Sequence, residues 1–222
     1  RVRVTVDRAR RAARIDFGGG WTDTPPHSIE RGGTVLNAAV TLKGRHPIVA
    51  EAEWLDEPRL LLESRDLETR AELHTLGEVF RYDDPSDVFA LHKAALVLRG
   101  LVPEGDSRTP LAEVFKDTGG IRLSTATNIP MGSGLGVSSI LAGTVLAALS
   151  FGSPQDAGRS DLAKARDAGD SPDMSRLFDE VLCVEQMLTT GGGWQDQVGG
   201  LTGGIKLVTS EPGLPQRVKV TP

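Results

Sequence analysis

Residues 130–139 read Pro-Met-Gly-Ser-Gly-Leu-Gly-Val-Ser-Ser and lead directly into an apolar, alanine-rich stretch. Gly132, Gly134 and Gly136 allow the backbone to come close to a bulky anion. The first amides of a helix that follows them are unpaired donors with a partial positive charge, which suits phosphate. The segment lacks the lysine of a Walker A loop, and its glycines do not fall as GxGxxG. We therefore predict a phosphate loop of a third kind.

Three serine hydroxyls lie near the anion that this loop would bind, at Ser133, Ser138 and Ser139. A hydroxyl at the start of the helix could bind a phosphate-bridging Mg²⁺. The alternative is plain N-capping, since serine is favoured at helix starts whatever the function.

A second chemical segment spans residues 13–26, where an apolar strand breaks into Gly18–Gly20 and then presents Trp21, Thr22 and Asp23. A carboxylate accepts hydrogen bonds from hydroxyls and an indole covers an apolar ring face, so the pair suits a sugar. The alternative is a tight hairpin with a core tryptophan and a capping aspartate.

The third segment joins Glu185, on a predicted helix, to the turn at 191–197, Gly-Gly-Gly-Trp-Gln-Asp-Gln. Glu185 directly follows Val184 on the flank of an apolar face, so we expect partial burial. A buried carboxylate needs a cation or strong donors, and Mg²⁺ carrying nucleotide phosphates would serve; the alternative is a surface ion pair. Asp196 could approach a substrate hydroxyl as a base or orienting group, or simply bond its own turn.

The elements that must position these segments alternate between strands and helices without the regular βαβ order of a wound sheet. We expect strands where apolar residues alternate or cluster, at 2–6, 15–17, 34–42, 47–54, 59–64, 121–126 and 205–208. We expect helices at 87–99 and from the glycine loop to about Ser150. Another runs from about Asp173 to Leu188, with Leu177, Val181, Val184 and Leu188 facing inward. A polar loop or lid occupies 152–173. This order predicts an α+β fold.

Composition narrows the class of protein. The 222 residues are 39% hydrophobic and 25% charged, with a net charge of -5, so no basic stripe favours nucleic acid. The single cysteine, Cys183, cannot form an internal disulfide, and no apolar stretch is long enough for a membrane span. Without a recognisable secretory signal, we expect a cytoplasmic protein.

Together the three segments resemble the GHMP sugar and metabolite kinases. Residues 14–23 are similar to that family's first motif, 130–139 to its ATP loop, and Glu185 with Asp196 to its metal carboxylate and catalytic aspartate. The string from Glu185 to Gly200 is most similar to the fucokinase branch. The resemblance implies a single GHMP kinase N-terminal domain over 1–222, of the ribosomal protein S5 domain 2-like α+β fold. The family's C-terminal domain would be missing from this sequence or truncated.

The resemblance implies an enzyme that uses ATP and Mg²⁺ to phosphorylate the anomeric hydroxyl of L-fucose. Asp196 would take or orient the hydroxyl proton, Arg14 would keep Asp196 ionised, and Ser138 and Glu185 would hold the metal. The implied ATP-binding residues are Pro130, Gly132, Ser133, Gly134, Leu135, Gly136, Val137, Ser138 and Ser139. The implied sugar-binding residues are Gly20, Trp21, Asp23, Gly193, Trp194 and Asp196. In some relatives a guanylyltransferase domain is fused outside the equivalent of this chain.

Two other functions stay open. A heptose 7-phosphate kinase would need a basic pocket for a second phosphate, which Arg31, Lys43 and Arg45 could supply. A non-catalytic sugar or nucleotide sensor could use the same scaffold, and substitution of Asp196 would separate it from an enzyme.

Overall fold

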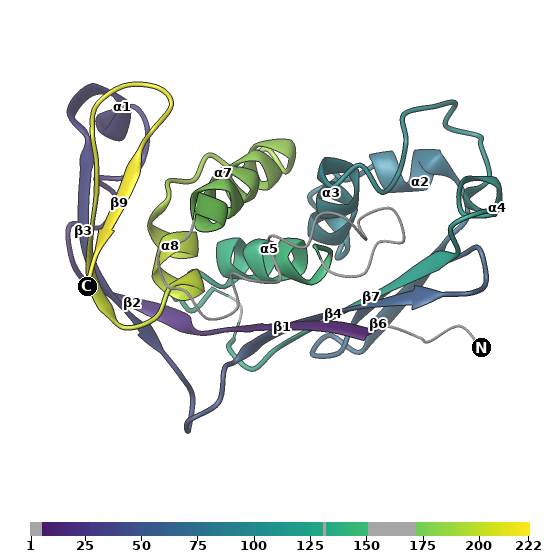
Figure 1. The fold of residues 1–222 in the computed structure, drawn as a ribbon, viewed down its shortest axis with the longest axis horizontal. Coiled ribbons are helices and arrows are strands. Elements are labelled where there is room, and N and C mark those ends of the chain that lie inside the picture. Colours follow the sequence, from purple (N-terminus) through teal and green to yellow (C-terminus); the bar gives the residue numbers. More distant parts are fainter. Residues whose placement is uncertain (1–5, 131, 151–171) are drawn as a thin grey trace.

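The computed structural model describes residues 6–130, 132–150 and 172–222 (Figure 1). The loop or lid predicted at 152–173 falls almost entirely outside the described residues, and so does the strand predicted at 2–6 except for Val6, where the observed strand begins. The described elements form two sheets with helices packed on them, so the α+β prediction is confirmed.

The larger sheet has five strands, and among these described strands only the β5–β7 pair is parallel. Their order is β1 (Val6–Arg11), β4 (Ile48–Leu55), β7 (Gly120–Thr127), β5 (Leu60–Ser64) and β6 (Thr69–Leu73). Along β4, Ile48, Ala50 and Ala52 are fully buried, as expected where alternate residues face a core. On the opposite face Glu51 pairs with Arg8 and Arg65, so this side of the sheet is charged.

The smaller sheet is antiparallel throughout, in the order β2 (Ala13–Gly18), β3 (Gly33–Val40), β8 (Ile205–Ser210) and β9 (Val218–Thr221). Only Ala12 separates β1 from β2, so one stretch of chain passes from one sheet into the other (Figure 1). Ile15 and Phe17 alternate as predicted, yet they face outward, with 42% and 61% of their surface exposed. The inward positions of β2 therefore belong to Arg14 and Asp16.

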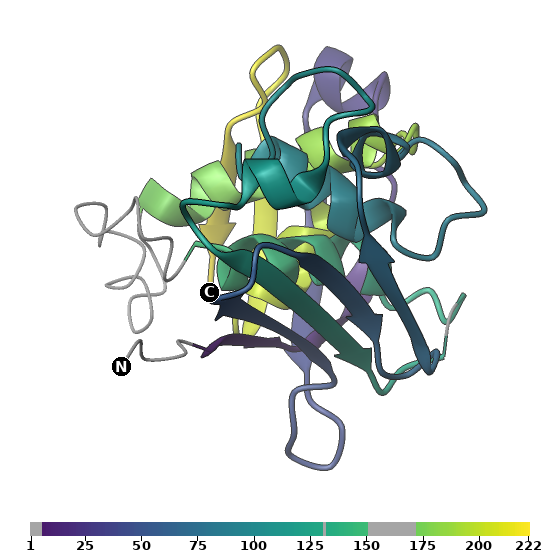
Figure 2. The same cartoon turned by 90° about the vertical axis from the view of Figure 1, so that its right-hand side faces the viewer.

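Helices α3, α5 and α7 lie on one side of the five-stranded sheet, whereas α1 lies beside the smaller sheet (Figures 1 and 2). Helix α5 (Val137–Ala148) packs on β4 and β1, and both α3 (Ala90–Leu98) and α7 (Pro172–Met187) pack against it. Helix α8 (Gln195–Leu201) contacts α5 as well as β2, β3 and β8, so it fills the junction between the two sheets. The short helices are α1 (His27–Arg31), α2 (Leu76–Phe80) and α4 (Leu111–Val114).

Several expectations about single elements were met and others were wrong. Leu177, Val181 and Val184 of α7 are buried as predicted, whereas Leu188 follows the helix and is only partly buried. The helix expected at 87–99 begins later, at Ala90, because the Asp87 side chain accepts the Phe89 amide and holds the preceding residues in a turn. Its buried residues are His92–Leu96. Helices α1, α2, α4 and α8 and strands β6 and β9 were not predicted.

Candidate functional site

Three segments that the sequence analysis singled out meet in one place: the end of the glycine loop, the strand that carries Arg14, and the turn that carries Asp196. The Arg14 side chain donates from Nε to Asp196 Oδ1 over 2.8 Å and from a terminal nitrogen to the same oxygen. The Arg14 amide also donates to the carbonyl of Leu135 in the loop, over 3.4 Å. A Cβ on Gly136 would lie 3.0 Å from the Cβ and Cγ of Asp196. Strand β2, the start of α5 and the start of α8 therefore form one contact.

Arg14 holds a second carboxylate that the sequence analysis did not single out. Its other terminal nitrogen lies 2.6 Å from Asp16 Oδ2. Burial raises the pKa of the Asp16 carboxyl, Arg14 opposes this, and the negative charge of Asp196 adds to it. The signal was present in the sequence, because residues two apart on a strand share a face.

Asp23 is buried and carries a structural contact. Its Oδ2 accepts the backbone amide of Gln195 over 2.8 Å, at the first residue of α8. A Cβ on Gly193 would lie 2.0 Å from the same oxygen, so this position requires glycine. Burial raises the pKa of Asp23 and the Gln195 amide opposes the rise. The capping role left open for Asp23 thus exists, on a helix far away in the sequence.

The two predicted tryptophans differ in environment. Trp21 is not a core residue, because 77% of its surface is exposed, and its φ of 72° places it in the left-handed region. Trp194 is fully buried, and its ring lies 2.7 Å from where a Cβ on Gly33 would be. Gly20 lies beside this cluster, since a Cβ there would come 3.5 Å from Gln195 Oε1. Trp21 is thus accessible to a ligand, whereas Trp194 supports the turn from within.

Glu185 is buried and points at the start of α5. Its Oε1 accepts a hydrogen bond from the hydroxyl of Ser139, whereas Ser138 is exposed. Its buried Oε2 finds no donor among the described residues. Burial raises the pKa of Glu185 to about 7, the Ser139 hydroxyl opposes the rise, and Asp196 and Asp23 add to it. A Cβ on Gly192 would lie 2.4 Å from Oε2.

The electrostatics of this site favour ligands that bring positive charge or hydroxyl donors. In the described part of the chain, Arg14 is the cation that pairs with carboxylates of this site, namely Asp16 and Asp196. The described residues contain no cluster of three or more histidines, cysteines, aspartates or glutamates that could bind a metal by themselves. A metal at Glu185 would need oxygens from hydroxyls or from a ligand, which matches Mg²⁺ with nucleotide phosphates.

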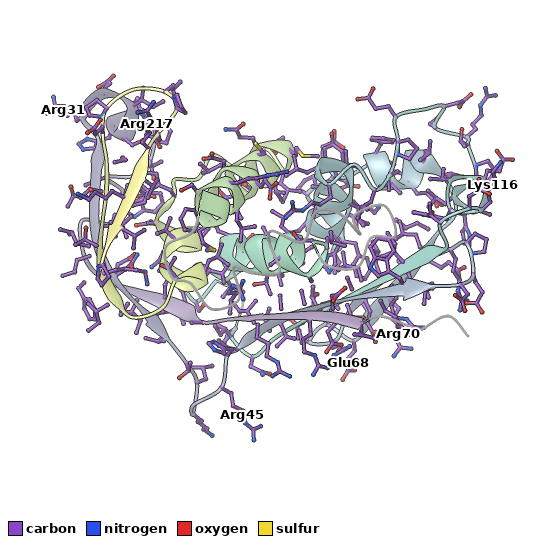
Figure 3. All side chains as sticks on the ribbon, in the orientation of Figure 1. Arg31, Arg45, Glu68, Arg70, Lys116 and Arg217 are labelled. Carbon is purple, nitrogen blue, oxygen red and sulfur yellow. The ribbon has the colours of Figure 1, made fainter. Side chains whose placement is uncertain are left out.

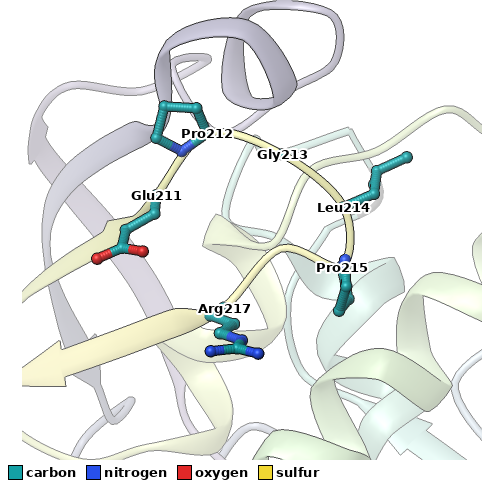
Figure 4. A pocket seen from close by; sticks show the side chains of 6 residues that line it. All are labelled: Glu211, Pro212, Gly213, Leu214, Pro215 and Arg217. Carbon is teal, nitrogen blue, oxygen red and sulfur yellow. The ribbon is translucent and has the colours of Figure 1, made fainter.

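Two further features lie outside the site. A pocket of about 210 Å³ on the loop between β8 and β9 is lined by Glu211, Pro212, Gly213, Leu214, Pro215 and Arg217 (Figure 4). None of the predicted site residues lines it. Among the helices described, none combines the length and apolar character that crossing a membrane requires.

Known proteins are similar to this chain in sequence. Residues 108–204 match the family model described as the GHMP kinases N terminal domain. The chain is 39% identical over 214 residues to the bifunctional fucokinase/GDP-fucose pyrophosphorylase of Arabidopsis thaliana, covering 94% of this chain and 17% of that protein. It is 40% identical over 210 residues to the L-fucokinase/L-fucose-1-P guanylyltransferase of Bacteroides fragilis, covering 93% of this chain and 20% of that protein. The chain thus spans about a fifth of the length of these relatives.

A solved structure supports the fold. The D-glycero-D-manno-heptose 1-phosphate kinase from Bacteroides thetaiotaomicron superposes with a TM-score of 0.67 at 20% sequence identity, over 98% of this chain and 60% of that one. This likeness concerns the fold alone. Over residues 108–204 the chain is therefore similar in sequence to the GHMP kinases N terminal domain.

Proposed function

We propose that this chain forms the ATP- and sugar-binding part of a kinase that phosphorylates the anomeric hydroxyl of L-fucose to give fucose 1-phosphate. The observation that supports this most is the position of Asp196, held by Arg14 and packed against Gly136 at the end of the glycine loop. A proton acceptor beside a phosphate loop is the pairing that phosphoryl transfer to a hydroxyl requires.

In this proposal Asp196 accepts or orients the proton of the attacking hydroxyl. Both hydrogen bonds from Arg14 fall on Oδ1, so Oδ2 is the oxygen left to face the sugar. Arg14 fixes the orientation of the carboxylate and favours its ionised form. Phosphoryl transfer depends mainly on positioning and charge neutralisation.

The loop from Pro130 to Ser139 would hold the phosphates of ATP, with its backbone amides and the start of α5. Glu185 and the hydroxyls of Ser138 and Ser139 would hold Mg²⁺, which neutralises phosphate charge when bound. Two observations fit this group: the buried Glu185 Oε2 has no donor in the described part of the chain, and its pKa is raised to about 7 by burial. A cation bound at Glu185 would give Oε2 a partner and would lower the pKa of the carboxyl.

The sugar would lie against the exposed Trp21, near Gly20 and the start of α8. An uncharged aromatic wall suits the 6-deoxy carbon of fucose, while Asp196 faces its hydroxyls. Trp194 and Asp23 would shape this surface from beneath, since both are buried. The names of both curated relatives pair a fucokinase with a second activity on fucose 1-phosphate or GDP-fucose. We extend that pairing to the protein that contains this chain.

The heptose 7-phosphate alternative loses its main support. Figure 3 shows Arg31, on α1, at the upper left of the molecule and Arg45, in the turn between β3 and β4, at its lower edge. They cannot line one pocket for a second phosphate, and Lys43 belongs to the same turn as Arg45.

The variant Asp196→Ala tests the proposal against a sensor on the same scaffold. In the full-length protein we expect it to abolish sugar-dependent ADP release and to leave nucleotide affinity within a few-fold of wild type. A matched change on the surface, Asp106→Ala, should leave turnover intact. Retained turnover in Asp196→Ala would remove the role assigned to this residue, and a wild-type protein that binds ATP without turnover would favour the sensor.

A further inference from the structure

Asp16 shares the guanidinium of Arg14 with Asp196. One terminal nitrogen of Arg14 lies 2.6 Å from Asp16 Oδ2, while Nε and the other terminal nitrogen donate to Asp196 Oδ1. The side chains of Arg14, Asp16 and Asp196 are 10%, 19% and 27% exposed. Water therefore screens their charges weakly. One positive charge is divided between two carboxylates.

The other charges around Asp196 do not replace this pairing. Glu185 on α7 and Asp23 in the turn after β2 add two further negative charges near Asp196. Lys206, on β8, lies at the opposite end of α8, where its ammonium donates to the carbonyls of Gly199, Thr202 and Gly204. Within the part of the chain that the structure describes, Arg14 is therefore the cation in direct contact with Asp196, and Asp16 competes for it.

We propose that Asp16 is a positioning residue that acts through Arg14: by holding one edge of the guanidinium, it limits the positive charge that Asp196 receives and keeps Asp196 a better proton acceptor. This inference rests on the proposed kinase function. An exclusive arginine pair would stabilise the Asp196 carboxylate more strongly and make it a weaker base.

A purely structural role makes a different prediction. If Asp16 only kept Arg14 in place, its replacement by an isosteric amide that still accepts a hydrogen bond would change little. A role through charge predicts that the same amide changes how turnover depends on pH. Asp16→Asn separates the two, because it keeps size and hydrogen-bond acceptor and removes only the charge.

The experiment compares wild type, Asp16→Asn and Asp16→Glu as full-length proteins, after thermal melts have established that each is folded. We expect the acid limb of kcat/KM for the sugar to move to lower pH by about one unit in Asp16→Asn, with kcat lowered and the KM for Mg·ATP unchanged. Asp16→Glu restores the charge and should restore the wild-type limb. Asp106→Asn is the matched control, because Asp106 accepts from Arg108 on the exposed surface far from the site.

A second readout does not depend on activity. Carbodiimide labels protonated carboxyls, so the pH dependence of Asp196 labelling, read by peptide mass spectrometry, reports its protonation directly. We expect the labelling curve of Asp196 to move to lower pH in Asp16→Asn. An unchanged labelling curve would overturn the inference, as would an unchanged acid limb in an active enzyme. Absence of turnover in wild type together with a shifted labelling curve would reject the kinase proposal and retain the charge-sharing by Asp16.

Discussion

Gly136, the last glycine of the loop, packs against Asp196 so closely that a methyl group on it would lie 3.0 Å from both Cβ and Cγ of the aspartate. The same methyl would lie 3.2 Å from Arg14 Nε. Gly136 also has a φ of 71°, in the left-handed region that other residues adopt at a cost. Gly136 and Asp196 therefore form one packed unit, and a substitution at either residue should displace the other.

Comparing Gly136→Ala with a control glycine should distinguish the effect of this contact from the effect of backbone strain. Gly44 has a φ of 75°, and a methyl group on it would meet no atom within 4 Å, so Gly44→Ala is the matched control. Both variants should lose about 1–2 kcal/mol of unfolding free energy from the left-handed backbone. Only Gly136→Ala should also lose most of its kcat, because the methyl displaces Asp196 or Arg14. Equal kcat in the two variants, measured by ADP release, would contradict the packed unit.

A second prediction concerns the turn before α8. A Cβ on Gly193 would lie 2.0 Å from Asp23 Oδ2, whereas a Cβ on Gly191 meets nothing within 4 Å. Gly193→Ala should break the hydrogen bond that the Gln195 amide donates to Asp23, lower the melting temperature and reduce turnover, since α8 carries Asp196. Gly191→Ala should behave like wild type in both measurements. A harmless Gly193→Ala would show that Asp23 does not fix the start of α8.

Glu185 should control the part of nucleotide affinity that depends on Mg²⁺. Glu185→Gln removes the charge and should weaken Mg·ATP binding by at least roughly tenfold, while ATP binding in EDTA stays as in wild type. Calorimetric titrations with and without the metal measure both. Glu180→Gln, on the same helix, is the control, because its carboxylate pairs with Arg99 and Arg176 instead. A Glu185→Gln protein with wild-type Mg·ATP affinity would exclude this metal assignment.

His92 should make the fold sensitive to acid. It is buried beside Thr125, whose hydroxyl lies 3.0 Å from its Nε2, and burial lowers its pKa from 6.5 to about 4. Between these pH values the unfolded chain binds the proton and the folded chain does not. The contribution of His92 is therefore complete above pH 6.5 and falls, by up to about 3 kcal/mol, as the pH drops toward 4. Urea unfolding of His92→Leu should give a flatter curve over this range, and parallel curves would refute the assignment.

The sequence predicted several elements well and the contacts between them poorly. Glycine spacing and the apolar periodicity of β4, β5 and α7 are local signals, and these elements lie where they were expected. Helix α8 was missed because glycines at 199 and 200 lower helix propensity, whereas tertiary contacts stabilise it: Gly200 packs on Ile140 and Lys206 binds its last carbonyls. Strand β6 was missed because its polar residues form an edge strand.

Side-chain roles were harder to predict, because they depend on contacts between distant segments. Trp21, which the alternative interpretation placed in the core of a hairpin, is exposed, whereas Trp194, predicted to bind the sugar, is fully buried. Asp23 caps a helix that begins 172 residues later, which no local pattern encodes. Asp16 was overlooked although it alternates with Arg14, because the apolar Ile15 and Phe17 indicated that the other face of the strand was the buried one.

The most direct test is ADP release by the full-length protein with Mg·ATP and one sugar at a time: L-fucose, D-arabinose, D-galactose or a heptose 7-phosphate. We expect the highest rate with L-fucose. D-arabinose, which has the same ring configuration without the C6 methyl, should be slower by roughly 10- to 200-fold, and the other two should be inactive. Equal rates with L-fucose and D-arabinose, or release only with the heptose phosphate, would contradict the assignment to fucose.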